Sequence, residues 1–132
     1  MIVTICCRRK STKPALMPAV ERYRSERIQK ISELAGRHKI PFAILSGKFG
    51  LIDSRTPIPY YDKLLTDEDG AGISEKSARF LKDKKIGKIL FLLPDPETDP
   101  HVPPYLRVLK KAAASAEAAL EVHCVPPYPE AL

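Results

Sequence analysis

Apolar residues gather into four short runs along the chain, and these runs predict β-strands. Three of them are almost wholly apolar, which is typical of strands buried on both faces of a sheet. The fourth run, LEVHCV, alternates apolar and polar positions, so we place it at the edge of the sheet. The predicted strands are residues 2–7, 42–46, 89–93 and 120–125.

Between these runs, apolar residues recur at the spacing of amphipathic helices. In residues 18–38, a step of 100° per residue from Val20 collects apolar side chains in one arc and charged ones opposite. Residues 74–84 and 104–117 follow the same period, and Pro104 suits the first turn of the latter helix. Three helices are therefore predicted between the strands.

The predicted elements run β-α-β-loop-α-β-α-β. This alternation predicts an α/β fold, a three-layer sandwich with helices on both faces of a four-stranded parallel sheet. Right-handed crossovers make strand order 2-1-3-4 the simplest arrangement. Because ligands of such sheets bind beyond the carboxyl ends of the strands, we expect a crevice formed by residues 6–13, 46–62 and 94–103.

Length and composition fit one ordinary domain. The 132 residues, 44% hydrophobic and 29% charged, predict a single α/β domain over residues 1–132. No apolar run approaches the roughly 18 residues of a membrane span, and the first residues place apolar positions before basic ones, the reverse of a secretory signal. Three cysteines, an odd number, argue against a disulfide framework. We expect a cytoplasmic protein with no membrane association.

The net charge of +6 is concentrated near the start of the chain. Residues 1–39 contain ten Lys and Arg against three acidic residues, whereas residues 40–132 contain twelve against thirteen. A localised basic region favours a partner that carries phosphate groups. The alternative is a solvated helix face.

Two arginines interrupt the apolar arc of the helix predicted for residues 18–38. Arg24 lies about 40° and Arg27 about 340° around the helix from Val20. A helix after a parallel strand begins at the carboxyl edge of the sheet, so we expect Arg24 to point into the crevice and Arg27 to flank it. A guanidinium there suits phosphate or carboxylate. The alternative is that both arginines pack beside the core or pair with an internal carboxylate.

The segment Cys6-Cys7-Arg8-Arg9-Lys10 follows the first predicted strand. We expect its three cations to hold a phosphate. Neighbouring cations also activate a thiol, which makes Cys6 a candidate nucleophile, although most buried cysteines are only small hydrophobic residues. Adjacent cysteines on a strand face opposite sides, so we expect only one to line the pocket. The spacing of cysteines and histidines is not that of a metal site, and no cofactor is expected.

A loop with two glycines, Ser46-Gly47-Lys48-Phe49-Gly50, follows the second predicted strand. Glycine permits close backbone approach or positive φ, and we expect this loop to contact the ligand. Lys48 is a candidate catalytic residue. The loop is not a P-loop, because the Gly four residues before the Gly-Lys pair and the Ser or Thr after it are missing.

The same connection continues through two prolines to Tyr60, Tyr61 and Asp62. The prolines stiffen the loop, and the tyrosine pair offers flat surfaces on which a base could stack. Asp62 is a candidate general base or acceptor for a ring nitrogen. The alternative for a lone aspartate is a cap or turn residue.

Several of these segments together resemble a bacterial and phage family of unknown function. They are the Cys-x-x-x-Lys segment at residues 6–10, Tyr23-Arg24, ILSGKFGLI at residues 44–52 and PYYD at residues 59–62, against the signature ILSAKxGLV…PYD. They are also similar to the lysine-transfer domain of archaeosine synthase and, more loosely, to the YaaA peroxide-stress proteins. The resemblance covers roughly residues 1–65. It implies a uracil-DNA-glycosylase-like or Rossmann-like fold, work on a modified 7-deazaguanine base in tRNA, or association with DNA.

Two function hypotheses follow. The first is an enzyme that modifies, exchanges or cleaves off a nucleobase. In this hypothesis the cationic loop and Arg24 hold a phosphate or carboxylate group of the substrate. The second is a non-catalytic nucleic-acid-binding module linked to stress or phage functions. A duplex binder needs a broad basic stripe and loses affinity steeply with salt, whereas a pocket enzyme binds a nucleotide or free base with little salt dependence. A redox-active thiol protein fits less well, because no CxxC is present.

Overall fold

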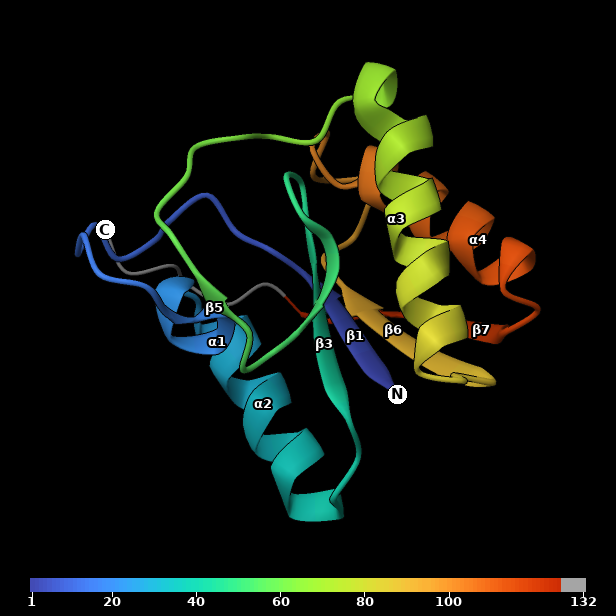
Figure 1. The fold of residues 1–132 in the computed structure, drawn as a ribbon, viewed down its shortest axis with the longest axis horizontal. Coiled ribbons are helices and arrows are strands. Elements are labelled where there is room, and N and C mark those ends of the chain that lie inside the picture. The colour runs from blue at the N-terminus through green and yellow to red at the C-terminus, as the bar shows by residue number, and fades with distance from the viewer. Residues whose placement is uncertain (127–132) are drawn as a thin grey trace.

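In the computed structural model, which describes residues 1–126, a mostly parallel sheet lies between two layers of helices (Figure 1). The strand order is β4-β3-β1-β6-β7, and β4 is the strand that runs antiparallel to its neighbour. Two further short strands, β2 and β5, form an antiparallel pair. The strands are β1 (Ile2–Ile5), β2 (Met17–Pro18), β3 (Phe42–Ser46), β4 (Gly50–Asp53), β5 (Pro57–Ile58), β6 (Lys88–Leu93) and β7 (Ala119–Cys124).

The helices cover opposite faces of the sheet. The chain moves along the sheet in one direction from β1 to β3, and in the opposite direction to β6 and then β7. Right-handed crossovers therefore place the helices of these two sets of connections on opposite sides of the sheet. Figure 1 shows α1 and α2 on one side and α3 and α4 on the other. The helices are α1 (Ala19–Arg22), α2 (Glu26–His38), α3 (Gly70–Asp83) and α4 (Pro103–Ser115), with a 3₁₀ turn η1 (Asp67–Asp69) before α3.

The sheet has five strands where four were predicted. Gly50 has a φ of 74°, a left-handed conformation that turns the chain back directly after β3. Leu51 and Ile52 then pair with Leu45 and Ile44, which covers the outer edge of β3. The short stretch Gly50–Asp53 was expected to be part of a loop, and the mixed α/β class is otherwise as predicted.

The helix predicted for residues 18–38 is two helices. Tyr23 and Ser25 have extended backbone between α1 and α2, and the Ser25 hydroxyl caps α2 by accepting from the Ile28 N–H at 3.3 Å. The break is held by the loop after β1, because the Arg24 N–H donates to the Arg9 carbonyl at 2.9 Å. The helical arc used to place Arg24 therefore does not extend across this break.

Burial follows the position of each strand in the sheet. Every residue of β1 and β3 is buried, as expected for central strands between two helical layers. β7 is largely exposed and lies at the edge, as its alternating sequence predicted. None of the helices within residues 1–126 has the length and apolarity needed to cross a membrane.

Candidate functional site

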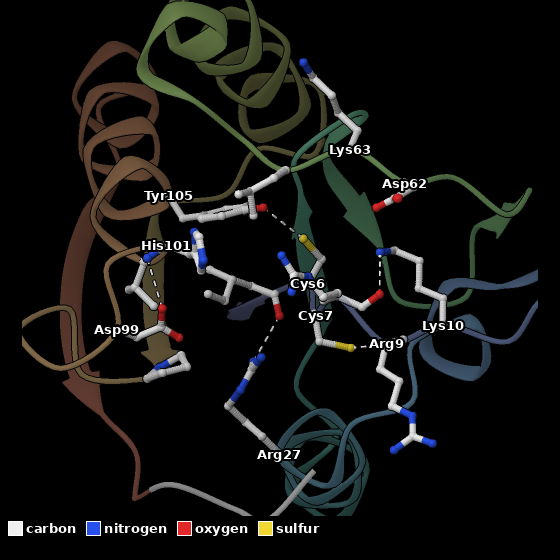
Figure 2. A pocket seen from close by; sticks show the side chains of 15 residues that line it. Cys6, Cys7, Arg9, Lys10, Arg27, Asp62, Lys63, Asp99, His101 and Tyr105 are labelled. Carbon is white, nitrogen blue, oxygen red and sulfur yellow. Dashed lines mark hydrogen bonds between the residues drawn. The ribbon is translucent and has the colours of Figure 1, made fainter. Parts of the chain in front are cut away.

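A cavity of about 620 Å³ opens beyond the carboxyl ends of β1 and β6 (Figure 2). The chain leaves these neighbouring strands toward opposite faces of the sheet, which is where open α/β sheets bind ligands. We call this cavity the crevice pocket. Its lining consists of residues 5–10, residues 62–64, Arg27, Pro94, Asp99, His101, Val102 and Tyr105.

Cationic side chains outnumber carboxylates in the lining of the crevice pocket. The cations come from the loop after β1, from α2 and from the loop before η1, whereas the carboxylates are those of Asp62 and Asp99. A partly enclosed cavity with one excess sign of charge concentrates ligands of the opposite sign. The pocket is therefore suited to an anionic ligand. The cationic residues are Arg8, Arg9, Lys10, Arg27 and Lys63.

Arg24 and Arg27, the two arginines expected at the crevice, lie differently from the prediction. Arg24 is exposed and does not line the crevice pocket, whereas Arg27 is buried and does. Arg27 is the second residue of α2, and its Nη1 donates to the Thr4 hydroxyl and, at 3.0 Å, to the Ile5 carbonyl. The prediction that Arg24 points into the crevice is wrong, because α2 begins only after Ser25.

Both cysteines of the Cys6-Cys7 pair line the crevice pocket. The expectation that only one would do so assumed an extended strand, but β1 ends at Ile5. The Cys6 thiol donates to the Tyr105 hydroxyl oxygen at 3.4 Å, and the Cys7 thiol donates to the Arg9 carbonyl at 3.0 Å. Figure 2 shows the two sulfur atoms pointing in different directions. Cys6 is buried, whereas Cys7 is only partly so.

Tyr61 belongs to a buried cluster behind the pocket. Its hydroxyl is hydrogen-bonded to the Tyr23 hydroxyl and, at 2.9 Å, to the Ser46 hydroxyl. Lys10 places its Nζ 4.7 Å from the centre of the Tyr61 ring and donates to the Arg8 carbonyl at 3.0 Å. Tyr61 and Ser46 are buried and do not line the crevice pocket, so the structure gives them a role in packing.

Burial determines the protonation of the tyrosines in this region. Desolvation raises the pKa of Tyr23, Tyr61 and Tyr105 above the ordinary tyrosine value, and the neighbouring Cys6 thiol adds to the rise. All three phenols are therefore neutral at physiological pH. They act as hydrogen-bonding groups that fix the loops around the pocket.

The glycine loop after β3 supports the site rather than lining the crevice pocket. A Cβ added at Gly47 would lie 2.9 Å from the Lys63 carbonyl oxygen, the Leu65 nitrogen and the Tyr105 hydroxyl. Phe49 packs edge-on against Tyr61, with ring centres 5.3 Å apart. Gly50 makes the turn into β4. This loop therefore holds residues 62–65 in place.

Lys48 and Tyr60 line a second cavity, of about 560 Å³, which we call the flanking hollow. It shares Asp62 and Lys63 with the crevice pocket. Both tyrosines proposed for stacking line the flanking hollow, but Tyr60 is 48% exposed, whereas Tyr61 is only 5% exposed. Gly47, Asp69 of η1 and residues of α3, including Lys76, also line this hollow.

Two pocket residues in the connection between β6 and α4 were not predicted from the sequence. Asp99 and His101 line the crevice pocket, and the Asp99 carboxylate accepts from the main-chain N–H of His101 at 3.0 Å. Residues 94–103 were expected at the crevice on topological grounds, and that signal could have identified both residues. Within residues 1–126 no group of three or more His, Cys, Asp or Glu is arranged to hold a metal ion.

Arg22 is fully buried, although the helical period over residues 18–38 puts it with the charged side chains opposite the apolar arc. Its Nη1 donates to the carbonyls of Ser11 and Lys13, both at 2.8 Å, and its Nη2 donates to those of Ala15 at 2.6 Å and Ile58 at 3.1 Å. These bonds join the loop after β1 to β5. Arg22 thereby anchors the chain that leads from β5 to Tyr60.

Comparison of the chain with known protein families, with curated proteins and with solved structures found no significant match.

Proposed function

We propose that the protein is an enzyme of nucleobase or nucleoside chemistry that binds a phosphate-bearing nucleotide in the crevice pocket. The observation that carries the proposal is the position of the cationic lining, at the point of the sheet where α/β folds bind ligands. A cavity of about 620 Å³ is within the usual range for small-molecule sites. Four of the ten cations of residues 1–39 line this pocket, namely Arg8, Arg9, Lys10 and Arg27.

The residues around the pocket have complementary roles in this proposal. Arg8, Arg9 and Lys10 contact the phosphate, for which planar guanidinium groups and ammonium donors are suited. Asp62 orients a ring nitrogen or a water molecule as a general base. His101, whose main-chain N–H is bonded to the Asp99 carboxylate, supplies a second proton-transfer group in its imidazole, from the connection after β6. General acid–base help of this kind contributes roughly 10²–10⁴-fold to a rate.

This assignment revises the catalytic candidates named from the sequence. Asp62 and Cys6 line the crevice pocket, but Lys48 lies in the flanking hollow. Cys6 is buried and bonded to Tyr105, so we place it as a positioning residue for α4 and give the chemistry to Asp62. The reaction class is modification, exchange or glycosidic cleavage of the base.

The sequence resemblance of residues 1–65 supports the same proposal. The families concerned are associated with a modified base in tRNA or with DNA, and they imply a uracil-DNA-glycosylase-like or Rossmann-like fold. We extend that fold name to this chain as part of the proposal, together with a cytoplasmic location. A non-catalytic nucleic-acid-binding module is the competing function.

Thermal unfolding with guanosine monophosphate, guanosine, guanine and a short duplex, at two salt concentrations, tests the proposal. A ligand at 100 times its dissociation constant stabilises by about 2.7 kcal/mol, a shift of several degrees in Tm. We expect a shift with the mononucleotide that Arg8→Ala diminishes and Arg24→Ala preserves, since both arginines are exposed and only Arg8 lines the pocket.

The catalytic assignment is tested with Asp62→Asn. This variant is expected to bind the mononucleotide but to turn over no nucleoside substrate, which chromatography of the released base would show. A shift given by the duplex alone, with a steep loss at higher salt, would favour the binding module instead.

A further inference from the structure

The flanking hollow has the features of a second nucleotide subsite. It adjoins the crevice pocket through Asp62 and Lys63, and it contains a half-exposed aromatic ring and lysines from two elements. Aromatic rings that stack on bases, combined with cations along a groove, are the usual means of holding single-stranded nucleic acid. The proposed reaction uses Asp62 of this lining but neither the exposed ring, Tyr60, nor Lys48 and Lys76.

Tyr60 is held ready for stacking. The chain is anchored on both sides of it, because the carbonyl of Ile58, two residues earlier, accepts from Arg22 and the hydroxyl of the next residue, Tyr61, is bonded in the core. The Tyr60 side chain nevertheless remains 48% exposed in the hollow. A ring positioned before binding loses little conformational freedom when a base packs on it.

Two of the three lysines that line the hollow are available to phosphate. Within residues 1–126, neither Lys48 nor Lys76 is ion-paired with a carboxylate, whereas Lys63 is paired with Asp69 at 2.9 Å. Lys48 follows β3 and Lys76 lies on α3, so the two cations enter the hollow from different elements. They could contact successive phosphates of one strand.

We propose that the flanking hollow binds the nucleotide next to the one in the crevice pocket, and that the substrate is a short single-stranded nucleic acid. This inference rests on the proposed function of the crevice pocket. Tyr60 stacks on the neighbouring base, while Lys48 and Lys76 contact the backbone. Adjacent bases that enter separate hollows on a common wall must be splayed apart, which an unpaired strand permits and a duplex does not.

Fluorescence anisotropy with fluorescein-labelled DNA and RNA hexanucleotides, and with the same sequences annealed as duplexes, tests the inference. We expect the single-stranded hexanucleotides to bind at least tenfold more tightly than guanosine monophosphate, measured by competition. Tyr60→Ala is expected to weaken hexanucleotide binding about tenfold or more, and Tyr60→Phe to preserve it. Neither change should alter the affinity for the mononucleotide, which occupies the other cavity.

The salt dependence provides a second readout. Lys76→Ala is expected to reduce the slope of log affinity against log salt by about 0.7, the value for one phosphate contact of a single strand. Arg79→Ala is the matched control, because Arg79 is an exposed cation on the same helix that does not line the hollow. Equal effects of the two changes would contradict the assigned contact.

The outcomes separate the two proposals. If the mononucleotide binds but the hexanucleotide binds no more tightly, or if Tyr60→Ala has no effect on the hexanucleotide, the second subsite is refuted and the crevice pocket stands. Tighter binding of the duplex also refutes the subsite. If neither mononucleotide nor hexanucleotide binds, both proposals fail.

Discussion

A Cβ at Gly47 would lie 2.9 Å from the hydroxyl oxygen of Tyr105, closer than real Cβ atoms come to other heavy atoms. The same position is 2.9 Å from two backbone atoms, the Lys63 carbonyl oxygen and the Leu65 nitrogen. The end of β3, the loop before η1 and the first turn of α4 therefore meet at this glycine. Their meeting fixes the wall shared by the crevice pocket and the flanking hollow.

Gly47→Ala is expected to destabilise the protein by about 1–3 kcal/mol, because backbone atoms cannot move away as a flexible side chain would. Denaturant unfolding measures this change. Gly36→Ala is the matched control: Gly36 lies inside α2, where an added Cβ would meet no atom within 4 Å, and alanine there should stabilise by up to about 1 kcal/mol. Equal stability of Gly47→Ala and the wild type would contradict the close packing.

The buried Arg22 guanidinium gives a second prediction. Arg22→Met removes the donors to four carbonyl groups and leaves several of them buried without a partner, so we expect a loss of at least about 3 kcal/mol. The loop of residues 11–15 should also become sensitive to limited proteolysis. Arg24→Met, two residues away and exposed, should change stability by no more than about 0.5 kcal/mol.

The contrast between Arg22, Arg24 and Arg27 shows where sequence reasoning about the site reached its limit. A single helical arc over residues 18–38 placed each side chain by its angle, but the chain is extended around Tyr23 and Ser25. The cause is tertiary: the Arg9 carbonyl accepts from the Arg24 N–H, and this pairing is distant in sequence. The amphipathic pattern is right within α2, where Ile28, Ile31 and Ala35 are buried.

The location of the crevice was predictable because it depends on the order of elements rather than on side-chain detail. Buried strands and alternating helices imply crossovers on both faces, and the loop after β1 is in the crevice as expected.

The orientation of the tyrosine pair could not be predicted from the sequence. Tyr60 and Tyr61 are equivalent in the sequence, and only the hydrogen bonds of Tyr61 to Ser46 and Tyr23 determine which one faces solvent.

The raised pKa values of Tyr23, Tyr61 and Tyr105 predict a loss of stability in alkali. Below about pH 10, the ordinary tyrosine pKa, the folded and unfolded chains both keep these protons, and the free energy of unfolding is at its full value with respect to these groups. Above it, the unfolded chain releases protons that the folded chain retains, so the free energy of unfolding falls as pH rises. Each such tyrosine contributes about 1.4 kcal/mol per pH unit to the slope.

Tyrosinate absorbance measures this behaviour directly. Of the five tyrosines in the chain, the three buried ones should ionise only as the circular dichroism signal is lost. The guanidinium-unfolded chain is the reference, in which all five ionise in one step near pH 10. Ionisation of all five near pH 10 while the protein remains folded would contradict the burial of the cluster.

The three cysteines provide a test of ligand position that does not depend on catalysis. Cys124 is exposed on β7, Cys7 is partly buried in the crevice pocket, and Cys6 is buried with its thiol bonded to Tyr105. Access to solvent should therefore make iodoacetamide label Cys124 first, Cys7 more slowly, and Cys6 only on unfolding. Peptide mass spectrometry at successive times gives the three rates.

A mononucleotide in the crevice pocket should protect Cys7 selectively. At 100 times the dissociation constant only about one molecule in a hundred has an empty pocket, so the labelling of Cys7 should slow by up to about 100-fold. Cys124 lies outside the pocket lining and serves as the internal control, because its rate should not change. Equal protection of both cysteines would indicate a global change in stability, and an unchanged Cys7 rate with a bound nucleotide would place the ligand elsewhere.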